Sequence, residues 1–376
     1  MHADVRSCCG WHRPRGVLRK ARSIARSPPA QEHRVYQYYL PVAMWILGQL
    51  EAHRASGAGC VALRVMAHAP AKAGWVPCLR PWRTHLASFL VIRSRPLVVG
   101  ISAPQGCGKT TIVECLTATF KALGIASASV SIDDFYLTRA EQVALAARDP
   151  DNPLLQLRGN AGSHDVALGT RTLDALRGLT SAGDEARIPR YDKSSFSGKG
   201  DRCPEEDWES VRGPLDVVLF EGWMLGFTAV GAERASAVSP SLVEVDRHLA
   251  AYREAWDSRV DAWVVVQVGS PEWVFEWRLQ AEHRMRATGK AGMTDQEVRD
   301  FCERFQPAYR LYLPGLYEKG PTTASSGKLL RLRIGQDRTL LSTVRVVERD
   351  GGGLSEHHAR LLTRPPTHCV QEASSG

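Results

Sequence analysis

The feature that most constrains the fold is a short apolar run that leads into a glycine-rich loop and then a helix-length segment. The run Leu97–Ile101 has the length and composition of a strand buried on both faces. The loop Ala103–Thr110 reads Ala-Pro-Gln-Gly-Cys-Gly-Lys-Thr, and Thr111–Leu123 follows it with helical composition. A strand, a tight loop and a helix in this order favour a sheet of parallel strands with helices on its faces.

The loop matches the phosphate-binding P-loop pattern, except that Ala103 stands in place of the first glycine. Phosphate oxygens need several backbone N–H donors that point inward, and glycines give the backbone that freedom. In this pattern the lysine neutralises the β- and γ-phosphates during catalysis and the threonine binds Mg²⁺. The alternative is an ordinary glycine-rich turn. We predict ATP and Mg²⁺ as cofactors, with the nucleotide held by Ala103, Gln105, Gly106, Cys107, Gly108, Lys109, Thr110 and Thr111.

Further apolar runs, separated by helix-length segments, continue the alternation of strand and helix. Two helix starts carry capping boxes, Thr138 with Glu141 and Thr294 with Glu297. The expected fold class is α/β, a three-layer P-loop NTPase with a mostly parallel central sheet and helices on both faces. Strands are expected over 128–132, 217–220, 263–268 and, as a closing edge strand, 329–334, and further helices over 35–54, from 166, and over 271–288.

Two of the predicted strands end in acidic residues. Asp133 and Asp134 follow the strand at 128–132, and Glu221 follows the strand at 217–220. A carboxylate at the carboxyl end of a parallel strand points into the crevice where ligands bind. Glu221 is therefore expected to bind Mg²⁺ together with the P-loop threonine. A carboxylate after 128–132 can accept the proton of an acceptor hydroxyl, although a turn-forming role is the alternative.

The segment at 131–136, Ser-Ile-Asp-Asp-Phe-Tyr, resembles the corresponding segment of uridine kinases, phosphoribulokinases and pantothenate kinases. The resemblance implies that Asp133 is the catalytic base and that Asp134 supports it or a metal-bound water. Kinases of this type close a cationic lid over the transferring phosphoryl group. The lid candidates do not share one helical face, so at most two of them are expected to reach the site. They are Arg278, Arg284 and Arg286.

A more specific resemblance covers about 35 to 334. The segments 152–165, which ends in Gly-Ser-His-Asp, 188–194, which reads Ile-Pro-Arg-Tyr-Asp-Lys-Ser, and 305–309 are similar to the glycerate kinases of plants and fungi. This resemblance implies phosphorylation of the 3-hydroxyl of D-glycerate. Glycerate is a small anion that needs a cation for its carboxylate and partners for its hydroxyls. The candidate substrate residues are Arg158, His164, Arg190, Tyr191 and Lys193.

Other functions stay open from the sequence. The acceptor of a related kinase is uridine, pantothenate or ribulose 5-phosphate, although no stacking groups for a nucleoside base are identifiable. A non-catalytic, nucleotide-dependent switch is the other alternative. It is less well supported, because the Asn-Lys-x-Asp segment typical of GTPases is absent.

The net charge of the chain is concentrated at its start. Residues 1–34 hold eight Lys and Arg against two acids, which accounts for six of the net charge of +8. An Arg-rich, acid-poor leader is typical of a transit segment, so the predicted location is the chloroplast, with mitochondrion or cytoplasm as alternatives. Neither a nucleic acid nor a membrane is expected as a partner. The kinase domain is expected over 35–338 and a disordered extension over 339–376.

Cys107 gives the predicted P-loop a thiol. Backbone donors, a helix N-terminus and Lys109 all favour a negative charge there, so we expect a stabilised thiolate that is sensitive to oxidation. A thioredoxin-type reductant would then be a partner. The alternative is a small residue tolerated in a tight loop. The nine cysteines include no Cys-x-x-Cys pair, so neither a zinc ribbon nor a disulfide framework is expected.

Overall fold

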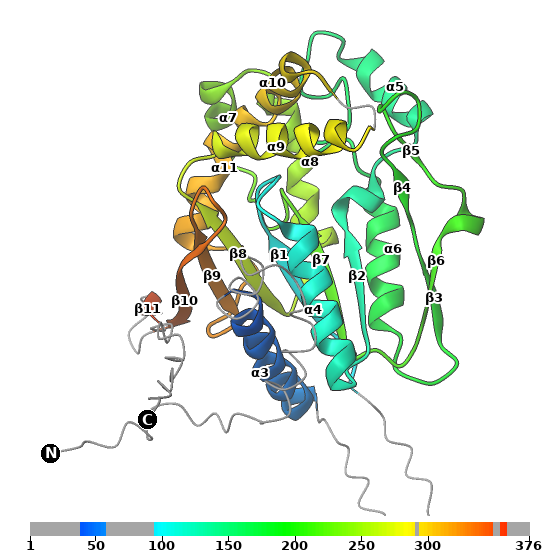
Figure 1. The fold of residues 1–376 in the computed structure, drawn as a ribbon, viewed down its shortest axis with the longest axis vertical. Coiled ribbons are helices and arrows are strands. Elements are labelled where there is room, and N and C mark those ends of the chain that lie inside the picture. The colour runs from blue at the N-terminus through cyan, green and yellow to red at the C-terminus, as the bar shows by residue number, and fades with distance from the viewer. Residues whose placement is uncertain (1–37, 58–93, 290–292, 349–353, 359–376) are drawn as a thin grey trace, which may run out of the picture.

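A sheet of seven strands, in the order β11-β10-β9-β8-β1-β7-β2, runs through the computed structural model (Figure 1). The structure describes residues 38–57, 94–289, 293–348 and 354–358, so the predicted leader lies outside the described residues. Five neighbouring strands are parallel, and the two at one edge are antiparallel. The parallel strands are β1 (Leu97–Ser102), β2 (Ser127–Ser131), β7 (Val217–Gly222), β8 (Ala262–Val268) and β9 (Leu329–Ile334), and the antiparallel ones are β10 (Leu340–Glu348) and β11 (Leu354–His358).

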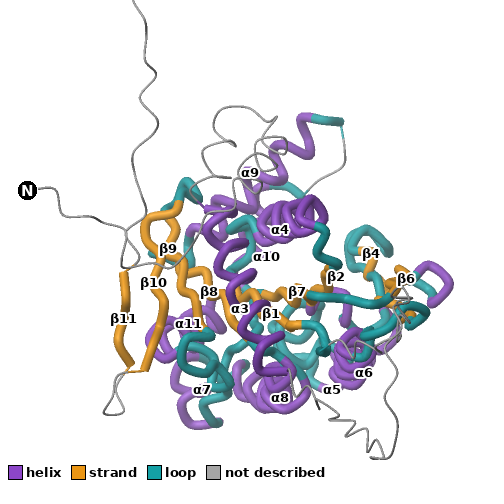
Figure 2. The backbone as a smooth tube through the Cα atoms, turned by 90° about the horizontal axis from the view of Figure 1, so that it is seen from below, coloured by secondary structure: helices purple, strands orange, loops and turns teal. Residues whose placement is uncertain are grey.

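Helices cover both faces of this sheet, with α4 on one side and α6, α8 and α11 on the other (Figure 2). Successive strand residues point to opposite faces, so Val99 joins a core with α3 and α4 whereas Val98 joins a core with α6, α8 and α11. The predicted three-layer α/β fold is confirmed. The helices are α3 (Leu40–Gly57), α4 (Lys109–Leu123), α5 (Arg139–Arg148), α6 (Val166–Arg177), α7 (Ala232–Val238), α8 (Leu242–Ala255), α9 (Trp273–Ala287), α10 (Asp295–Glu303) and α11 (Gln306–Lys319).

The two predicted capping boxes are present at the starts of α5 and α10, where Thr138 and Thr294 accept the backbone N–H of the third helical residue. The first predicted helix, at 35–54, instead begins at Leu40. Pro41 therefore lies in the first turn of this α-helix, where proline is tolerated, and residues 38 and 39 before it are π-helical. Among the described residues, no helix is both long and apolar enough to cross a membrane.

The C-terminal part of the sheet differs from the prediction. Strand β9 was expected at the sheet edge, but it is internal, because β8 pairs with it on one side and β10 on the other. The expected disordered extension from 339 is wrong for β10 and β11. In β10, Thr343, Val344 and Val346 are buried, and β-branched residues of this kind suit a strand. Residues 359–376 lie outside the described residues.

Two small hairpins and three 3₁₀ turns complete the fold at the β2 edge of the sheet and near α8. Strand β3 (Glu185–Ile188) pairs with β6 (Glu209–Arg212), and β4 (Tyr191–Asp192) pairs with β5 (Asp201–Arg202). These hairpins carry the segment at 188–194 to the carboxyl end of β2. The 3₁₀ turns are η2 (Ile132–Phe135), η3 (Glu205–Asp207) and η4 (Asp257–Arg259).

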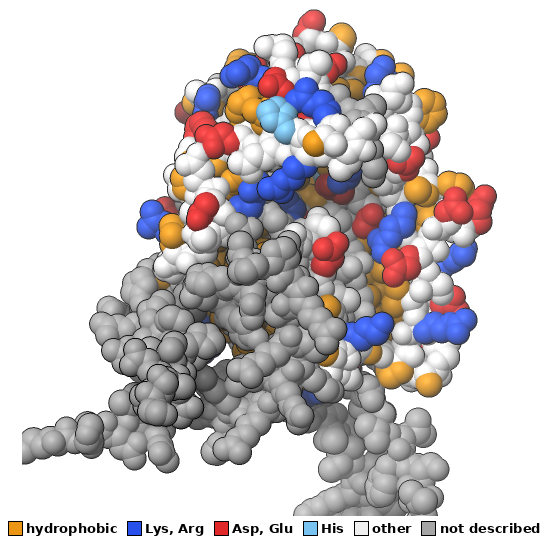
Figure 3. All heavy atoms as spheres, viewed as in Figure 1, with side chains coloured by type: hydrophobic (Ala, Val, Ile, Leu, Met, Phe, Trp, Pro, Cys, Tyr) orange, Lys and Arg blue, Asp and Glu red, His pale blue; other side chains and the backbone are white. Residues whose placement is uncertain are grey.

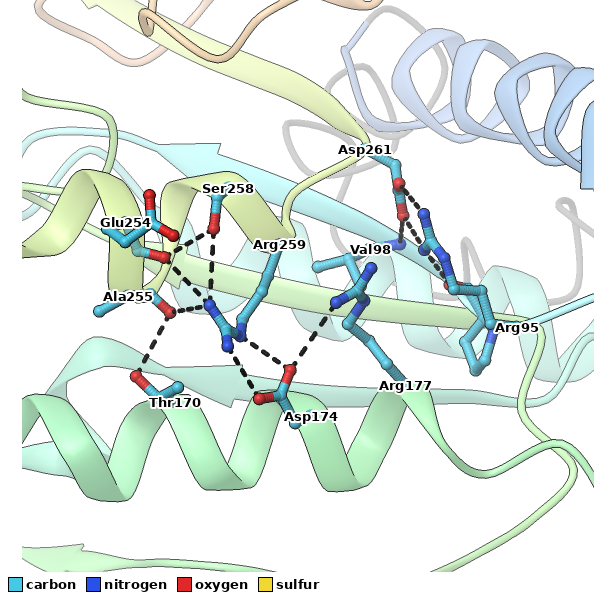
Figure 4. A network of polar contacts seen from close by, with 11 residues as sticks. Arg95, Val98, Thr170, Asp174, Arg177, Glu254, Ala255, Ser258, Arg259 and Asp261 are labelled. Atoms are coloured by element: carbon cyan, nitrogen blue, oxygen red, sulfur yellow. Dashed lines mark hydrogen bonds and ion pairs between the residues drawn. The ribbon is translucent and has the colours of Figure 1, made fainter.

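An ion-pair network ties the elements together at the amino ends of the strands (Figure 4). Asp261, just before β8, accepts two hydrogen bonds from Arg95 at 2.6 and 2.7 Å and one from the N–H of Val98 at 2.9 Å. Arg259 of η4 binds Asp174 of α6 through both carboxylate oxygens at 2.8 Å. Although burial opposes it, the pairing with Arg95 holds the pKa of Asp261 below its usual value. This network fixes the base of the sheet and leaves the opposite end for chemistry.

Candidate active site

The loop between β1 and α4 has the backbone that an anion cradle requires. Gly106 and Gly108 have φ of 75° and 102°, in the left-handed region that favours glycine. Helix α4 begins at Lys109, so its free N–H groups and its dipole face the loop. Ala103 does not share the positive φ of the two glycines. An alanine therefore fits where the pattern has a glycine.

Side chains from distant parts of the chain hold this loop in place. Tyr309 of α11 accepts the N–H of Gln105 at 3.1 Å, and the ammonium group of Lys109 lies 3.3 Å from the carbonyl of Pro104. Thr110 and Thr111, at the start of α4, are exposed. In Figure 3, basic side chains gather on the band of surface below helix α9, where this loop lies.

The expected reactivity of Cys107 is not supported. Its side chain is buried, and burial raises the pKa of the thiol in spite of the nearby charge of Lys109. This direction is opposite to the stabilised thiolate that the sequence suggested, because the sequence could not show that the thiol points into the core. A reductant partner gains no support from this geometry.

Asp133 lies in η2, at the carboxyl end of β2, and pairs with a lysine from the loop after β4. Lys193 Nζ is 2.6 Å from its carboxylate, and Tyr136 donates a second hydrogen bond. Burial opposes ionisation, but Lys193 and, more weakly, Lys109 lower the pKa of Asp133 to about 2. Asp134 has a different partner, Arg190, at 3.0 Å. It therefore anchors Arg190 rather than contacting the centre of the site.

Glu221 occupies the end of β7, between β1 and β2. Burial raises the pKa of this carboxyl above its usual value, with Lys109 and Lys193 acting in the opposite direction. Its Oε2 atom is buried, and no described residue donates a hydrogen bond to it. A buried acceptor of this kind fits a bound cation. No group of three or more His, Cys, Asp or Glu side chains could hold a metal in the described part of the chain, which agrees with the few protein ligands that Mg²⁺ takes beside phosphate.

Tyr136 contacts two of the five candidate substrate residues, His164 and Tyr191. Its ring stacks on His164, with centroids 4.6 Å apart, and meets Tyr191 edge-on at 5.3 Å. Lys193 reaches the site through Asp133. Arg190 pairs with Asp134 instead. Arg158 lies over the ring of Tyr191 and donates to backbone carbonyls of residues 193, 198 and 199. Arg158 supports the loop that carries Lys193.

The structure does not bring the lid arginines to the site. Arg278 pairs with the buried Glu282 and lies over the ring of Phe301, so it joins α9 to α10. Arg286 pairs with Asp295 at 2.5 Å. Arg284 is exposed and makes no ion pair or hydrogen bond with any described residue. The described residues show no contact of the three with Lys109, Asp133 or Glu221, the residues on which a lid would close.

Sequence reasoning missed several residues of the site. Tyr136 stands in the segment that carried the first resemblance, and its place directly after the acids was the available signal. Tyr252, which bonds to His164 at 2.6 Å, comes from α8 and carried no signal. Trp277 and Arg338 contact the P-loop from two other elements, and no sequence pattern pointed to either of them.

Comparisons with known proteins agree with this architecture. A scan against models of protein families found no match. A chloroplastic D-glycerate 3-kinase of Arabidopsis thaliana is 45% identical over 309 residues, which are 82% of this chain and 61% of that protein. An uncharacterized kinase of Schizosaccharomyces pombe is 39% identical over 235 residues, which are 60% of this chain and 84% of the relative.

One solved structure is matched almost along its full length. The D-glycerate 3-kinase of Cryptococcus neoformans is 33% identical, with a TM-score of 0.67, and the match covers 82% of this chain and 98% of that chain. The likeness thus extends over both sequence and fold. The chain belongs to the D-glycerate 3-kinase family.

Proposed function

We propose that this protein transfers the γ-phosphoryl group of ATP to the 3-hydroxyl of D-glycerate. The observation that carries the proposal is the cluster of two carboxylates, Asp133 and Glu221, and two ammonium groups, Lys109 and Lys193, whose charges act on one another beside the P-loop. A nucleotide, a cation and a proton acceptor each find a suitable partner in this cluster. The names of the Arabidopsis and Cryptococcus relatives support D-glycerate as the acceptor.

The P-loop and two oxygen ligands would hold the nucleotide. Backbone N–H groups of the loop and Lys109 bind the phosphates, and the exposed Thr110 and the buried Glu221 would hold Mg²⁺ directly or through water. A Mg²⁺ ion held there would supply positive charge that offsets the negative charge developing on the transferring phosphoryl group. The role of the chain is to align the phosphates with the acceptor at the carboxyl ends of β1, β7 and β2.

Asp133 is the proposed base. Its low pKa keeps it ionised, so it can orient an acceptor hydroxyl by accepting its hydrogen bond and can take the proton as the oxygen–phosphorus bond forms. A weak base suffices where the transition state is loose. In this structure, the ammonium group of Lys193 forms an ion pair with the carboxylate of Asp133. Incoming phosphate offers that ammonium group a competing anion, which would free Asp133 for the acceptor.

His164 is the proposed donor to the carboxylate of the acceptor. The N–H of Gly162 donates to the Tyr252 hydroxyl oxygen, so the Tyr252 O–H is left to donate to His164 Nδ1 at 2.6 Å. This places the imidazole proton on Nε2, which is buried with no hydrogen-bond partner among the described residues. Burial lowers the pKa of His164 to about 4, so the ring is neutral at neutral pH. A buried N–H donor without a partner suits a carboxylate oxygen.

An acceptor panel tests the function. The purified chain with Mg·ATP should release ADP with D-glycerate, and phosphorus NMR should place the phosphate on the 3-hydroxyl rather than the 2-hydroxyl. Uridine, pantothenate and ribulose 5-phosphate serve as the competing acceptors. Turnover with one of them and none with glycerate would overturn the substrate assignment while leaving the kinase assignment in place.

We also propose a chloroplast location. The basic, acid-poor composition of residues 1–34 and the chloroplastic relative in Arabidopsis support it. A reporter fused after residues 1–34 should enter plastids. A reporter that stays in the cytosol or enters mitochondria would reject this location without affecting the proposed reaction.

A further inference from the structure

An arginine from the far end of the chain contacts the P-loop. Arg338 lies in the turn between β9 and β10, which rises beside the loop between β1 and α4 (Figure 1). Its Nε–H donates to the carbonyl of Gly106 at 2.8 Å. The backbone of Arg338 has φ of 63°, a conformation that costs a non-glycine residue free energy. The contacts of the side chain therefore have to offset this strain.

Helix α9 completes the arrangement. The guanidinium group of Arg338 lies over the indole of Trp277, 5.0 Å from the ring centroid, and donates to Gln280 at 3.0 Å. Trp277 is 1% exposed, and its Cβ lies 2.8 Å from the point where a side chain on Gly106 would begin. Its indole N–H donates to the carbonyl of Gln336 at 2.6 Å, within the same turn as Arg338. Three segments that are far apart in sequence thus meet at one residue of the P-loop.

The direction of this contact determines how the loop presents its donors. A trans peptide is planar, so the carbonyl of Gly106 and the N–H of Cys107 point in opposite directions. Arg338 holds the carbonyl on the side of the turn and of α9. The N–H of Cys107 is thereby directed to the other side of the loop, where Lys109 begins helix α4. A glycine at φ of 75° has little intrinsic preference for this orientation and needs an external contact to keep it.

We propose that Arg338 is a positioning residue that sets the nucleotide affinity of the P-loop by fixing the Gly106–Cys107 peptide and joining it to α9. The proposal rests on the proposed function only in requiring that the loop bind nucleotide. Loss of a hydrogen bond from a charged donor, together with the freed peptide, should weaken binding of Mg·ADP by about tenfold or more. The KM for the acceptor should stay within about twofold, because Arg338 acts through Gly106 of the P-loop and through Trp277 and Gln280 of α9.

The test is calorimetric titration of the full chain with Mg·ADP. Arg338→Ala is compared with Arg338→Lys, which can still donate to the carbonyl but cannot stack its head group flat on Trp277, and with Arg333→Ala, an exposed arginine of β9, as the matched control. We expect the Kd of Mg·ADP to rise in Arg338→Ala, to rise less in Arg338→Lys, and to stay unchanged in the control. The melting temperatures without nucleotide should agree within a few degrees.

Each result bears on the proposal. An unchanged Kd in Arg338→Ala overturns it, and so does an equal rise in the KM values for ATP and for acceptor, which would indicate a general loss of structure. If Arg338→Ala does not fold, Arg338→Lys and Gln280→Ala replace it. Each should raise the Kd of Mg·ADP while leaving the KM for the acceptor nearly unchanged. If the wild-type chain itself binds no Mg·ADP, the proposed function fails first. If the wild type and Arg338→Ala bind Mg·ADP equally well, the role of Arg338 is rejected and the proposed kinase function is unaffected.

Discussion

The ammonium group of Lys193 lies 2.6 Å from the carboxylate of Asp133. Because the proposed roles of the two residues differ, substitutions of each should change different kinetic quantities. Asp133→Asn removes the proton acceptor but keeps the shape of the side chain. We expect turnover to fall by about two orders of magnitude or more, because general-base catalysis typically contributes that much. The Kd of Mg·ADP should change little, since the asparagine leaves the P-loop intact. Steady-state kinetics and calorimetric titration measure the two quantities.

The matched control for this variant is Asp207→Asn, which changes an exposed carboxylate of η3. Its turnover should equal that of the wild type. Near-normal turnover in Asp133→Asn would show that the hydroxyl proton leaves by another route and that the assigned base is wrong.

Lys193 should control the acid limb of the pH profile. Its charge and hydrogen bond lower the pKa of Asp133 to about 2, so the wild-type base stays ionised throughout the range from pH 4 upward. Lys193→Met removes this stabilisation, and the pKa of Asp133 should rise, because burial then acts with less opposition. The kcat/KM profile of the variant should therefore decline as pH falls at a higher pH than that of the wild type.

Lys199→Met is the control for the pH profile, because Lys199 is an exposed lysine of the same loop, whereas Lys193 is the lysine that contacts Asp133. The control and the wild type should share one profile. If Lys193→Met loses activity uniformly at every pH, Lys193 acts on the phosphate or the acceptor alone and does not tune Asp133.

At the scale of elements, the sequence predicted structure well wherever a segment fixes its own conformation. The strand β1, the glycine-rich loop and the helix α4 are each signalled by local composition, and so are the capping boxes of α5 and α10. The contacts within the site were not predictable in this way. Lys193, Tyr252 and Arg338 reach it from three other elements, and only the packing of the sheet brings them there.

The strand β10 shows the same limit and gives an element-scale prediction. Val344 and Val346 are buried, and β10 pairs along the whole of β9. A chain that ends after Thr339 loses two buried valines at roughly 1.5–3 kcal/mol each and exposes β9 as an edge. We expect its free energy of unfolding to fall by about 3 kcal/mol or more, with aggregation on heating.

The control chain ends after His358 and keeps both antiparallel strands. Urea unfolding, followed by tryptophan fluorescence, compares the two truncated chains with the full chain. Equal stability of the chain that ends after Thr339 would mean that β10 contributes nothing to the fold, in contradiction to its burial.

For the whole molecule, the free energy of unfolding should depend on pH, because several buried titratable groups have shifted pKa values. The contribution of each group can be measured separately. Burial lowers the pKa of His164 in the folded chain to about 4, below the ordinary histidine value of 6.5, so the unfolded chain binds more protons between these values. The contribution of His164 is therefore fully present above pH 6.5 and is lost as pH falls through this window. His248 acts in the same direction, whereas the raised pKa values of Glu221, Asp134 and Asp257 act in the opposite one.

A difference measurement isolates the contribution of His164 to the free energy of unfolding. The unfolding free energies of the wild type and of His164→Gln, which cannot titrate, are compared from pH 7.5 to 4.5. The wild type should lose stability relative to the variant by up to about 1.4 kcal/mol per pH unit below pH 6.5, which is the limit for one proton. Asp133 does not interfere, since its folded pKa of about 2 places its own loss of stability below this window. A difference that stays constant with pH would mean that His164 can be protonated in the folded protein, and a neutral Nε2–H donor to the acceptor would then have to be given up.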